Sequence, residues 1–208
     1  IPILVGGTGL YFKSLTDGLV KIPNVPIRFR TKIRKLHKDL GQKKFYQKLL
    51  KLDPSYKKNI NSTDAQRSIR AYEVKLFTKK SLHEWFEDTK SNFKNEEFCK
   101  IYIDYPRQDL IKRIANRTDE ILKSGAIPEV KRFIKLNVKK DKSVNKAIGI
   151  GEIKEFLKNK KELSEISEKI SIKTRQYAKR QSTWARGNMQ SWLKLMPQDL
   201  NKFLKKIK

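Results

Sequence analysis

The chain has few of the residues that form crosslinks or metal sites. Its single cysteine, Cys99, excludes a disulfide within the chain, and its two histidines, His37 and His83, are isolated from each other. Three such residues do not make a recognisable metal site, so we expect no metal ligands here. This composition fits a reducing compartment, and we expect a cytoplasmic protein that works as a monomer.

Long hydrophobic runs are also lacking. The longest is the opening Ile1-Pro2-Ile3-Leu4-Val5, far too short to cross a bilayer, and no basic region followed by an apolar helix marks a signal peptide. We therefore expect no membrane segment. Glycine (9) and proline (7) are too few for a low-complexity chain. The chain has no initiator methionine and starts directly in an apolar run, so we expect a segment upstream of Ile1.

Acidic residues are outnumbered. The chain has 49 Lys and Arg against 22 Asp and Glu, which gives a formal charge of +27. Such a charge attracts polyanions, and nucleic acid is the leading class of partner. The alternative is a lysine-biased proteome without any anionic partner, and composition does not decide between them. With 208 residues and 38% apolar content, the chain is long enough for one domain carrying an insertion.

Two segments have the pattern of strands. Residues 1–5 are apolar throughout, as in a buried parallel strand, and end at Gly6-Gly7, after which Thr8 can cap a helix. Residues 98–105 alternate in polarity and stop at Pro106. The lysine-rich stretch between them has mostly helical spacing. We expect an α/β core built from residues 1–23 and 96–208, an all-α insertion over residues 24–95, and a chain that is helix-rich overall.

Helical patterns continue through the C-terminal half. One helix closes at Gly125, a long one runs from Leu163 to Arg186, and residues 192–195 are a candidate edge strand. One face of the long helix carries its large apolar residues: Leu163, Ile166, Ile170, Tyr177 and Trp184. Gln181 falls on this face, so its amide needs a hydrogen-bond partner.

Arginine is the exception among the cations, because only 12 of the 49 basic residues are Arg. A guanidinium can grip a phosphate with two bonds or stack on a base, whereas a lysine is a point charge. On the long helix the cations form a stripe almost opposite the apolar face, as in a phosphate-lined groove or a solvated helix. For any one arginine, an ordinary pair with a carboxylate, such as Arg70 with Glu73, is the alternative. Nine of the twelve fall in four groups: Arg28 and Arg30; Arg67 and Arg70; Arg113 and Arg117; Arg175, Arg180 and Arg186.

A helix of the expected insertion separates polar from apolar residues. Thr63 or Asp64 can cap it, and its apolar stripe starts at Ala65. Gln66, Arg67 and Arg70 cannot all lie in the core, and such a surface suits base edges and phosphates. A solvated face is the alternative.

Five segments resemble, in order, those of the tRNA dimethylallyltransferases, also called tRNA isopentenyltransferases or IPP transferases. They are VGGTGLY at 5–11, DAQRSIRAYEV at 64–74, RIANR at 113–117, KAIG at 146–149 and TRQYAKRQSTW at 174–184. The resemblance implies transfer of a dimethylallyl group from dimethylallyl diphosphate to N6 of the adenosine next to the anticodon. It also implies a parallel sheet like that of P-loop kinases, with a helical insertion that grips the anticodon stem-loop.

The resemblance assigns roles to single residues. Thr8 would lie in the reaction channel near the target adenosine, and Arg113 and Arg117 would lie toward the diphosphate. We add the cations of the long helix as candidates for tRNA binding. The tRNA-binding candidates are Arg30; Gln66, Arg67, Ser68, Ile69 and Arg70; Lys146, Ala147, Ile148, Gly149, Ile150 and Gly151; and Arg175, Lys179, Arg180 and Arg186.

The chain departs from the family pattern in two places. No phosphate-binding loop ending in Gly-Lys-Ser/Thr occurs in these residues, because the family's loop and general-base aspartate precede the Gly-Gly-Thr strand. Mg²⁺ is expected for the complete enzyme, and we expect this chain alone to bind tRNA without modifying it. At Ile150-Gly151 the family usually has an aromatic and then a basic residue, so a tRNA contact there is weakened. The alternatives are a non-catalytic basic RNA-binding module and the product of a degraded gene.

Overall fold

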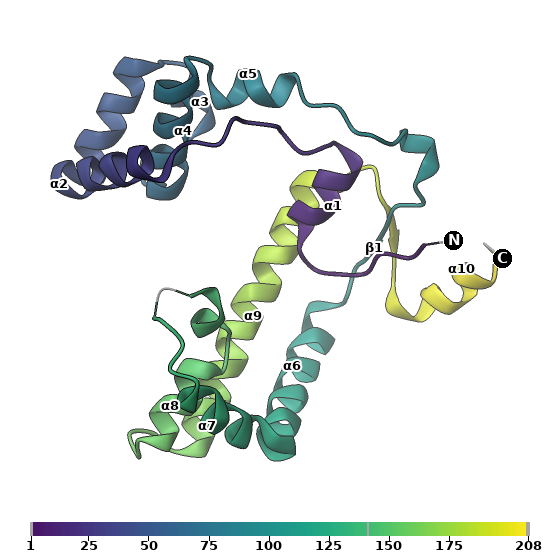
Figure 1. Ribbon diagram of the computed structural model, residues 1–208. Helices are drawn as coiled ribbons and strands as arrows, with labels where there is room; N and C mark the ends of the chain where they lie inside the picture. Colours follow the sequence, from purple (N-terminus) through teal and green to yellow (C-terminus); the bar gives the residue numbers. More distant parts are fainter. Residues whose placement is uncertain (1, 141, 207–208) are drawn as a thin grey trace. The chain divides into compact units, whose positions relative to one another are not determined.

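The computed structural model describes residues 2–140 and 142–206 and divides the chain into two compact units (Figure 1). The first, here called the strand unit, consists of Ile1–Gly9 and Cys99–Lys208. The second, the helical unit, is the continuous segment Leu10–Phe98. The divisions after residues 9 and 98 lie outside the expected insertion, whose bounds were residues 24 and 95. Residues 1, 141, 207 and 208 of the expected core lie outside the described residues.

The helical unit contains a kinked helix packed against a second helix. Its longest element is broken at Gly41, where φ is +71°, a left-handed value that glycine adopts without steric cost. Short breaks at Asp53-Pro54 and near Asn61 separate the helices. The elements are α1 (Gly9–Thr16, which begins at the boundary), α2 (Ile27–Leu52), α3 (Tyr56–Asn59), α4 (Ala65–Thr78), α5 (Leu82–Glu87) and a 3₁₀ turn at Asn95–Glu97.

Aromatic residues fill the core between α2 and α4. Phe45 and Leu49 are fully buried, and the ring of Phe45 lies 5.1 Å from that of Tyr72, centroid to centroid. Tyr56 is also buried, and its hydroxyl accepts a hydrogen bond from the Leu82 amide at 2.9 Å. Buried aromatic rings contribute most of the apolar area in such a core. The packing therefore fixes α4, which carries the candidate RNA contacts.

The two ends of the helical unit meet. The hydroxyl of Ser91 donates to the Leu15 carbonyl at 3.0 Å. Gly18, with φ of +95°, lies so close to Lys90 that a Cβ there would overlap the Lys90 carbonyl. The chain therefore enters and leaves this unit along two segments that touch.

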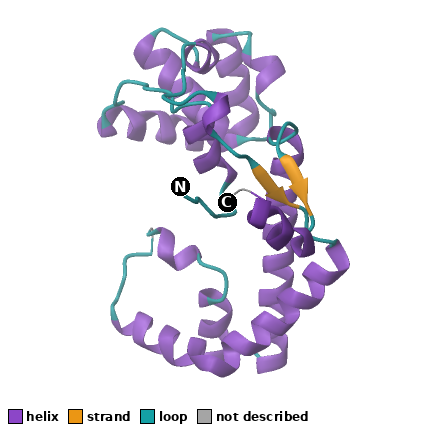
Figure 2. Cartoon of the chain, turned by 90° about the vertical axis from the view of Figure 1, so that its right-hand side faces the viewer, coloured by secondary structure: helices purple, strands orange, loops and turns teal. Residues whose placement is uncertain are grey.

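The strand unit contains a small parallel sheet among helices. β1 (Ile101–Ile103) pairs with β2 (Leu193–Leu195), with Tyr102 opposite Lys194 (Figure 2). β1 confirms the middle of the strand predicted over residues 98–105, and β2 confirms the predicted edge strand. The remaining elements are α6 (Arg107–Ile121), a π-helical turn (Leu122–Ala126), α7 (Ile127–Lys135), a 3₁₀ turn (Ser143–Lys146), α8 (Ile150–Leu157), α9 (Leu163–Asn188), a 3₁₀ turn (Pro197–Asp199) and α10 (Leu200–Lys206).

The predicted strand at the start of the chain is wrong for the residues that the structure describes. Residues 2–5 form no strand, and Ile3, Leu4 and Val5 are 76%, 65% and 91% exposed. Ile1 lies outside the described residues. A buried strand needs a neighbouring strand to satisfy its backbone, and the sheet of the described residues contains only β1 and β2. The chain is thus helix-rich α/β with a small parallel sheet.

Helix α9 organises the strand unit by packing against α6 and α8 (Figure 1). Ile166 is fully buried with Leu122, Val130 and Ile153 in one core. The predicted apolar face of α9 is only partly right, because Leu163 and Tyr177 are 43% and 44% exposed. None of the described helices is long and apolar enough to cross a membrane.

Candidate nucleic-acid interface

Asp64 caps the N-terminus of α4, which confirms one of the two predicted caps. Its carboxylate accepts a hydrogen bond from the Arg67 backbone amide at 2.9 Å and pairs with the Arg67 guanidinium at 2.7 Å. The bond from the Arg67 amide and the pair with its side chain hold the pKa of Asp64 below its ordinary value. The Arg67 side chain remains 75% exposed. It therefore keeps donors free for a ligand.

A buried carboxylate gathers three arginines on the helical unit. Glu73 of α4 is 1% exposed. One of its oxygens lies 3.4 Å from Nε of Arg30 and 3.5 Å from Nη1 of Arg70, and the other lies 3.9 Å from Nε of Arg34. The three arginine side chains are 36%, 40% and 61% exposed, in the order Arg30, Arg70, Arg34. We call these four residues the arginine cluster.

The arginine cluster has more positive than negative charge. One carboxylate faces three guanidinium groups, so a formal charge of +2 remains on a small area. Each guanidinium has five N–H donors, so the three arginines have fifteen, and a single carboxylate cannot accept hydrogen bonds from all of them. The remaining donors suit phosphate oxygens. The pair of Arg70 with Glu73 was the expected alternative to RNA binding, and the structure makes that pair while leaving the arginines partly exposed.

Sequence reasoning missed Arg34 and the central place of Glu73. Arg30 and Arg34 stand four residues apart on α2, a spacing that puts both on one face of a helix and was the available signal. Which carboxylate they would meet could not be read from that spacing.

The five residues from Gln66 to Arg70 divide between surface and interior. Gln66 and Arg67 are exposed, whereas Ser68 is fully buried and Ile69 packs against the core. The Ser68 hydroxyl donates to the Asp64 carbonyl at 2.7 Å and accepts from Gln42 at 3.2 Å. Ser68 was expected to contact tRNA. Its side chain is buried and supports the start of α4 from within, and the tRNA contact stays a prediction.

The Gly-Gly-Thr-Gly turn lies against α9 in the strand unit. The Gln181 side chain donates to the Gly7 carbonyl at 3.0 Å, which confirms that its amide needs a partner. A Cβ on Gly9 would overlap the ring of Trp184, and one on Gly7 would overlap the Gln181 amide. Glycine is thus required at position 9, where the neighbour is a rigid ring, whereas the Gln181 side chain near Gly7 can shift. Thr8, between the two glycines, is exposed.

Arg113 and Arg117 share the exposed face of α6. Ile114 and Thr118 point into the protein, which turns the two arginines outward. The Arg113 guanidinium carbon lies 5.6 Å from the centroid of the Tyr105 ring. No carboxylate pairs with either arginine among the described residues. Both are available to an anion.

Residues 146–151 form the corner that leads into α8. Gly149 is buried with φ of +102°, and its amide donates to the Glu152 carboxylate at 3.0 Å. Burial alone would raise the pKa of Glu152, but its hydrogen bonds, first that from Lys173, lower it below the ordinary value. Gly149 therefore shapes the corner from inside. The exposed members of the segment are Lys146, Ala147, Ile148 and Gly151, and Ile150 is half-buried.

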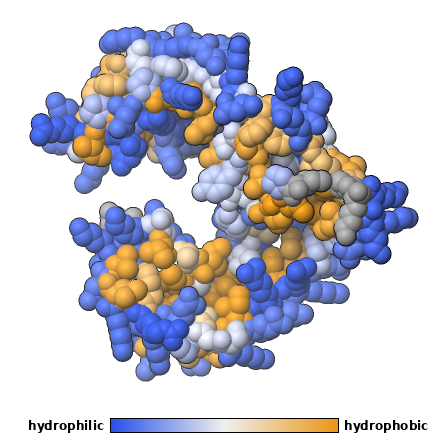
Figure 3. All heavy atoms as spheres, turned by 45° about the vertical axis from the view of Figure 1, so that its right-hand side comes forward, coloured by the Kyte–Doolittle hydropathy of each residue, from blue (hydrophilic) through white to orange (hydrophobic). Residues whose placement is uncertain are grey.

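The predicted stripe of cations on α9 consists of Arg175, Lys179 and Arg186, which differ in exposure. Lys179 and Arg180 line a shallow hollow of about 330 Å³ with Gln176 and Thr183. Arg186 is exposed and donates to the Ser182 carbonyl at 3.4 Å, whereas Arg175 is half-buried. Hydrophilic residues cover much of the visible surface, with apolar patches between them (Figure 3).

The described part of the chain contains no cluster of typical metal-binding side chains. No three His, Cys, Asp or Glu side chains come together there.

Known proteins resemble the chain along most of its length. The family model for IPP transferases matches residues 1–188. A tRNA dimethylallyltransferase of Pelagibacter ubique is 56% identical over 208 residues, and one of Rickettsia bellii is 42% identical over 185 residues. A crystal structure of a eukaryotic dimethylallyltransferase acting on tRNA is similar over 86% of this chain and 46% of that one, with a TM-score of 0.70 and 26% identity. The match with the Pelagibacter ubique protein covers 100% of this chain and 66% of that protein. The match with the Rickettsia bellii protein covers 88% of this chain and 58% of that protein.

Proposed function

The chain belongs to the IPP transferase family, and from this we propose that the complete protein transfers a dimethylallyl group from dimethylallyl diphosphate to N6 of the adenosine next to the anticodon of tRNA. The names of its relatives support the reaction, and the parallel pairing of β1 with β2 supports a core related to P-loop kinases. A cytoplasmic location and a monomeric state stay predictions.

The arginine cluster is the observation that carries the RNA-binding part of the proposal. Arg30, Arg34 and Arg70 are held by one buried carboxylate and keep part of their side chains in solvent. Gln66 and Arg67 stand exposed on the same helix, α4. Phosphate contacts would position the RNA, and Gln66 and Arg67 would meet the bases of the anticodon loop. The helical unit thus becomes the anticodon-binding unit.

We assign the contacts with the reacting groups, the target adenosine and the diphosphate, to the strand unit. Thr8 would meet the target adenosine, since it is exposed and its flanking glycines fix it against α9. Arg113 and Arg117 would bind the diphosphate, whose charge must be held for it to leave. Lys146 to Gly151, Arg175, Lys179, Arg180 and Arg186 would contact tRNA. Mg²⁺ is expected for the complete enzyme, but the described residues do not fit it, so no step passes through it here.

We predict that these 208 residues bind tRNA and do not modify it. Binding should weaken steeply as salt rises, because cations that neutralise phosphates release counterions. Transfer should be lost because N6 of adenine is a poor nucleophile, and these residues contain neither the phosphate-binding loop nor the general base implied by the family. Filter binding at several salt concentrations gives the slope, and nucleoside analysis after incubation with dimethylallyl diphosphate and Mg²⁺ gives the product.

Two results would contradict this prediction. Turnover at ordinary enzyme rates would mean that a base and a diphosphate site lie within these residues, and Asp104, Asp109 and the Arg113/Arg117 pair would be tested first. Binding that salt does not change would remove the electrostatic basis of the interaction. If the longer protein also binds tRNA without modifying it, the alternative of a non-catalytic RNA-binding module stands.

A further prediction concerns the exposed residues of α4. Replacing Gln66 or Arg67 by alanine should weaken the binding of an anticodon stem-loop by about 1–3 kcal/mol if either contacts a base. The fold should survive the Arg67 change, because Asp64 accepts from the backbone amide of residue 67. Lys44→Ala is the matched control for Arg67, since it removes one exposed positive charge from the same unit. If Gln66→Ala, Arg67→Ala and Lys44→Ala all bind with the same affinity, this face of α4 is exposed to solvent and does not contact the RNA.

A further inference from the structure

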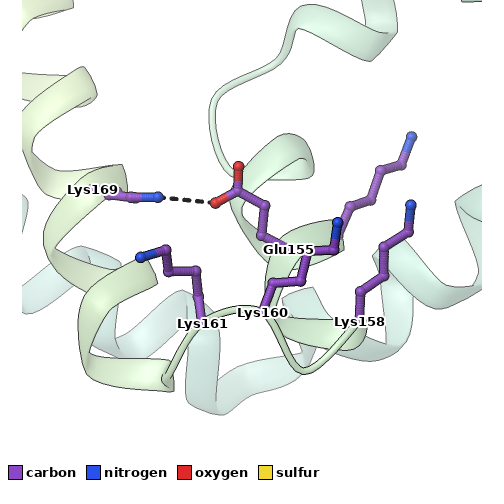
Figure 4. Close-up of a pocket in the computed structure, with 6 residues that line it drawn as sticks. Glu155, Lys158, Lys160, Lys161 and Lys169 are labelled. Atoms are coloured by element: carbon purple, nitrogen blue, oxygen red, sulfur yellow. Dashed lines mark hydrogen bonds and ion pairs between the residues drawn. The ribbon is translucent and has the colours of Figure 1, made fainter.

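Lysines surround a hollow in the strand unit that none of the roles assigned above uses. It lies where α8 turns into α9 and has a volume of about 440 Å³. Figure 4 shows the side chains that line it reaching from both helices and from the turn. Five of the six lining residues are lysines, and the set is Lys154, Glu155, Lys158, Lys160, Lys161 and Lys169. We call this set the lysine hollow.

The carboxylates nearby pair with only two of these five lysines. Glu155 pairs with Lys169 at 2.9 Å, and Glu165, outside the hollow, pairs with Lys161 at 3.0 Å. Lys158 and Lys160 have no ion pair among the described residues, and Lys154 lies 5.2 Å from the centroid of the Phe133 ring. The five lysines, counted with their partners Glu155 and Glu165, leave a formal charge of +3. Grouping like charges costs free energy, which a bound polyanion would offset.

The turn itself accounts for only part of this grouping. Lys158 stands at the C-terminal end of α8, where a cation is favoured by the helix dipole. Asn159 has φ of +54°, and the Lys160 amide donates to the Glu155 carbonyl at 3.1 Å. These features reverse the chain and would do so without further lysines. Lys154, Lys161 and Lys169 each have one partner within the unit, and neither the turn nor these partners accounts for gathering five lysines around one hollow.

Helix α9 sets the distance between the lysine hollow and the Gly-Gly-Thr-Gly turn. Gly7 and Gly9 lie against Gln181 and Trp184. Lys169 precedes these two residues by 12 and 15 positions on the same helix, and Lys161 stands just before its start. At about 1.5 Å per residue, the hollow lies roughly 20 Å or more along α9 from the turn. A base held at Thr8 does not reach that far, but the backbone of the same RNA does.

We propose that the lysine hollow binds backbone phosphates of the tRNA at a distance from the modified nucleotide. The inference rests on the proposed function, because it takes tRNA as the polyanion. Lysines are point charges that hold phosphates without reading sequence, so the hollow contributes affinity and orientation. A shallow open site suits an extended backbone better than a small ligand, which would be enclosed.

The test is a triple substitution with a matched control. Lys154, Lys158 and Lys160 are replaced by Gln in one variant, and Lys123, Lys131 and Lys135 in the other. The control lysines are exposed, belong to the same unit and have no ion pair among the described residues. Both variants lose three positive charges, so their net charge and long-range attraction to RNA are equal. Thermal unfolding of each checks that the fold is kept.

We expect the first variant to bind a full-length tRNA transcript about tenfold or more weakly than the control variant. The slope of log affinity against log salt should fall by up to about three, one for each phosphate that a lysine no longer neutralises. Equal affinities and equal slopes for the two variants would overturn the proposal. If the unaltered chain binds tRNA in that experiment, the proposed function survives the failure; if it binds none, the proposed function itself fails.

Discussion

Replacing Gly9 by alanine is expected to destabilise the strand unit by about 1–3 kcal/mol, the usual cost of overpacking a close contact. The added Cβ would overlap the Trp184 ring, which is too rigid to move aside as a flexible chain end does. Gly7→Ala should cost less, because its Cβ would meet only the end of the Gln181 side chain. Urea unfolding followed by circular dichroism measures both.

Two further variants separate steric overlap from a general effect of alanine. Gly187→Ala is the matched control, since a Cβ there meets nothing within 4 Å and alanine favours helix. Gly9→Ala made in a Trp184→Leu background should cost clearly less than in the unaltered chain, because the smaller side chain makes room. An equal cost in both backgrounds would show that Trp184 is not what excludes a side chain at position 9.

Replacing Glu73 by glutamine is expected to weaken tRNA binding about tenfold even though it makes the chain more positive. Glutamine keeps the size of the side chain but removes the charge that draws Arg30, Arg34 and Arg70 together. If net charge alone determined affinity, the variant would bind tRNA more tightly. If Glu73 orients the arginines, the variant binds tRNA more weakly, so the two explanations predict opposite changes in affinity. We also expect a loss of about 1–3 kcal/mol of stability, moderated because the arginines can regain water.

Glu87→Gln is the matched control for Glu73→Gln. Its carboxylate is 63% exposed and pairs only with His83 among the described residues. The change raises the charge of the helical unit by the same amount, and binding should stay equal or become slightly tighter. Filter binding and thermal unfolding are measured on both variants. Tighter binding by Glu73→Gln would mean that the arginines need no carboxylate to orient them.

Local signals in the sequence were sufficient for the helices and their ends. The cap at Asp64, the closure at Gly125 and the long helix beginning at Leu163 each depend on residues close in sequence, and the structure has all three. The same holds for the need of Gln181 for a partner, although the identity of that partner, Gly7, is a contact across 174 positions.

Interactions between distant segments were beyond such signals. An apolar run such as residues 1–5 has the pattern of a strand, but pairing requires a neighbour that the run itself does not specify. In α4, helical spacing separates Gln66 and Arg67 from the apolar stripe, yet it does not reveal that the Ser68 hydroxyl is buried and accepts a hydrogen bond from Gln42 of α2. The ion pairs of Glu73 with Arg30 and Arg34 likewise depend on α2, which lies far from Glu73 in the sequence.

The contact between Ser91 and Leu15 gives the helical unit adjacent ends, as in a domain that can be inserted into another protein. Its chain enters and leaves at adjacent points, and one uninterrupted segment holds its whole core. Segments with neighbouring ends can be inserted into a host protein, or excised from it, with little disturbance to either. Exchange of this segment between host proteins would therefore require only two new peptide bonds, formed at adjacent points.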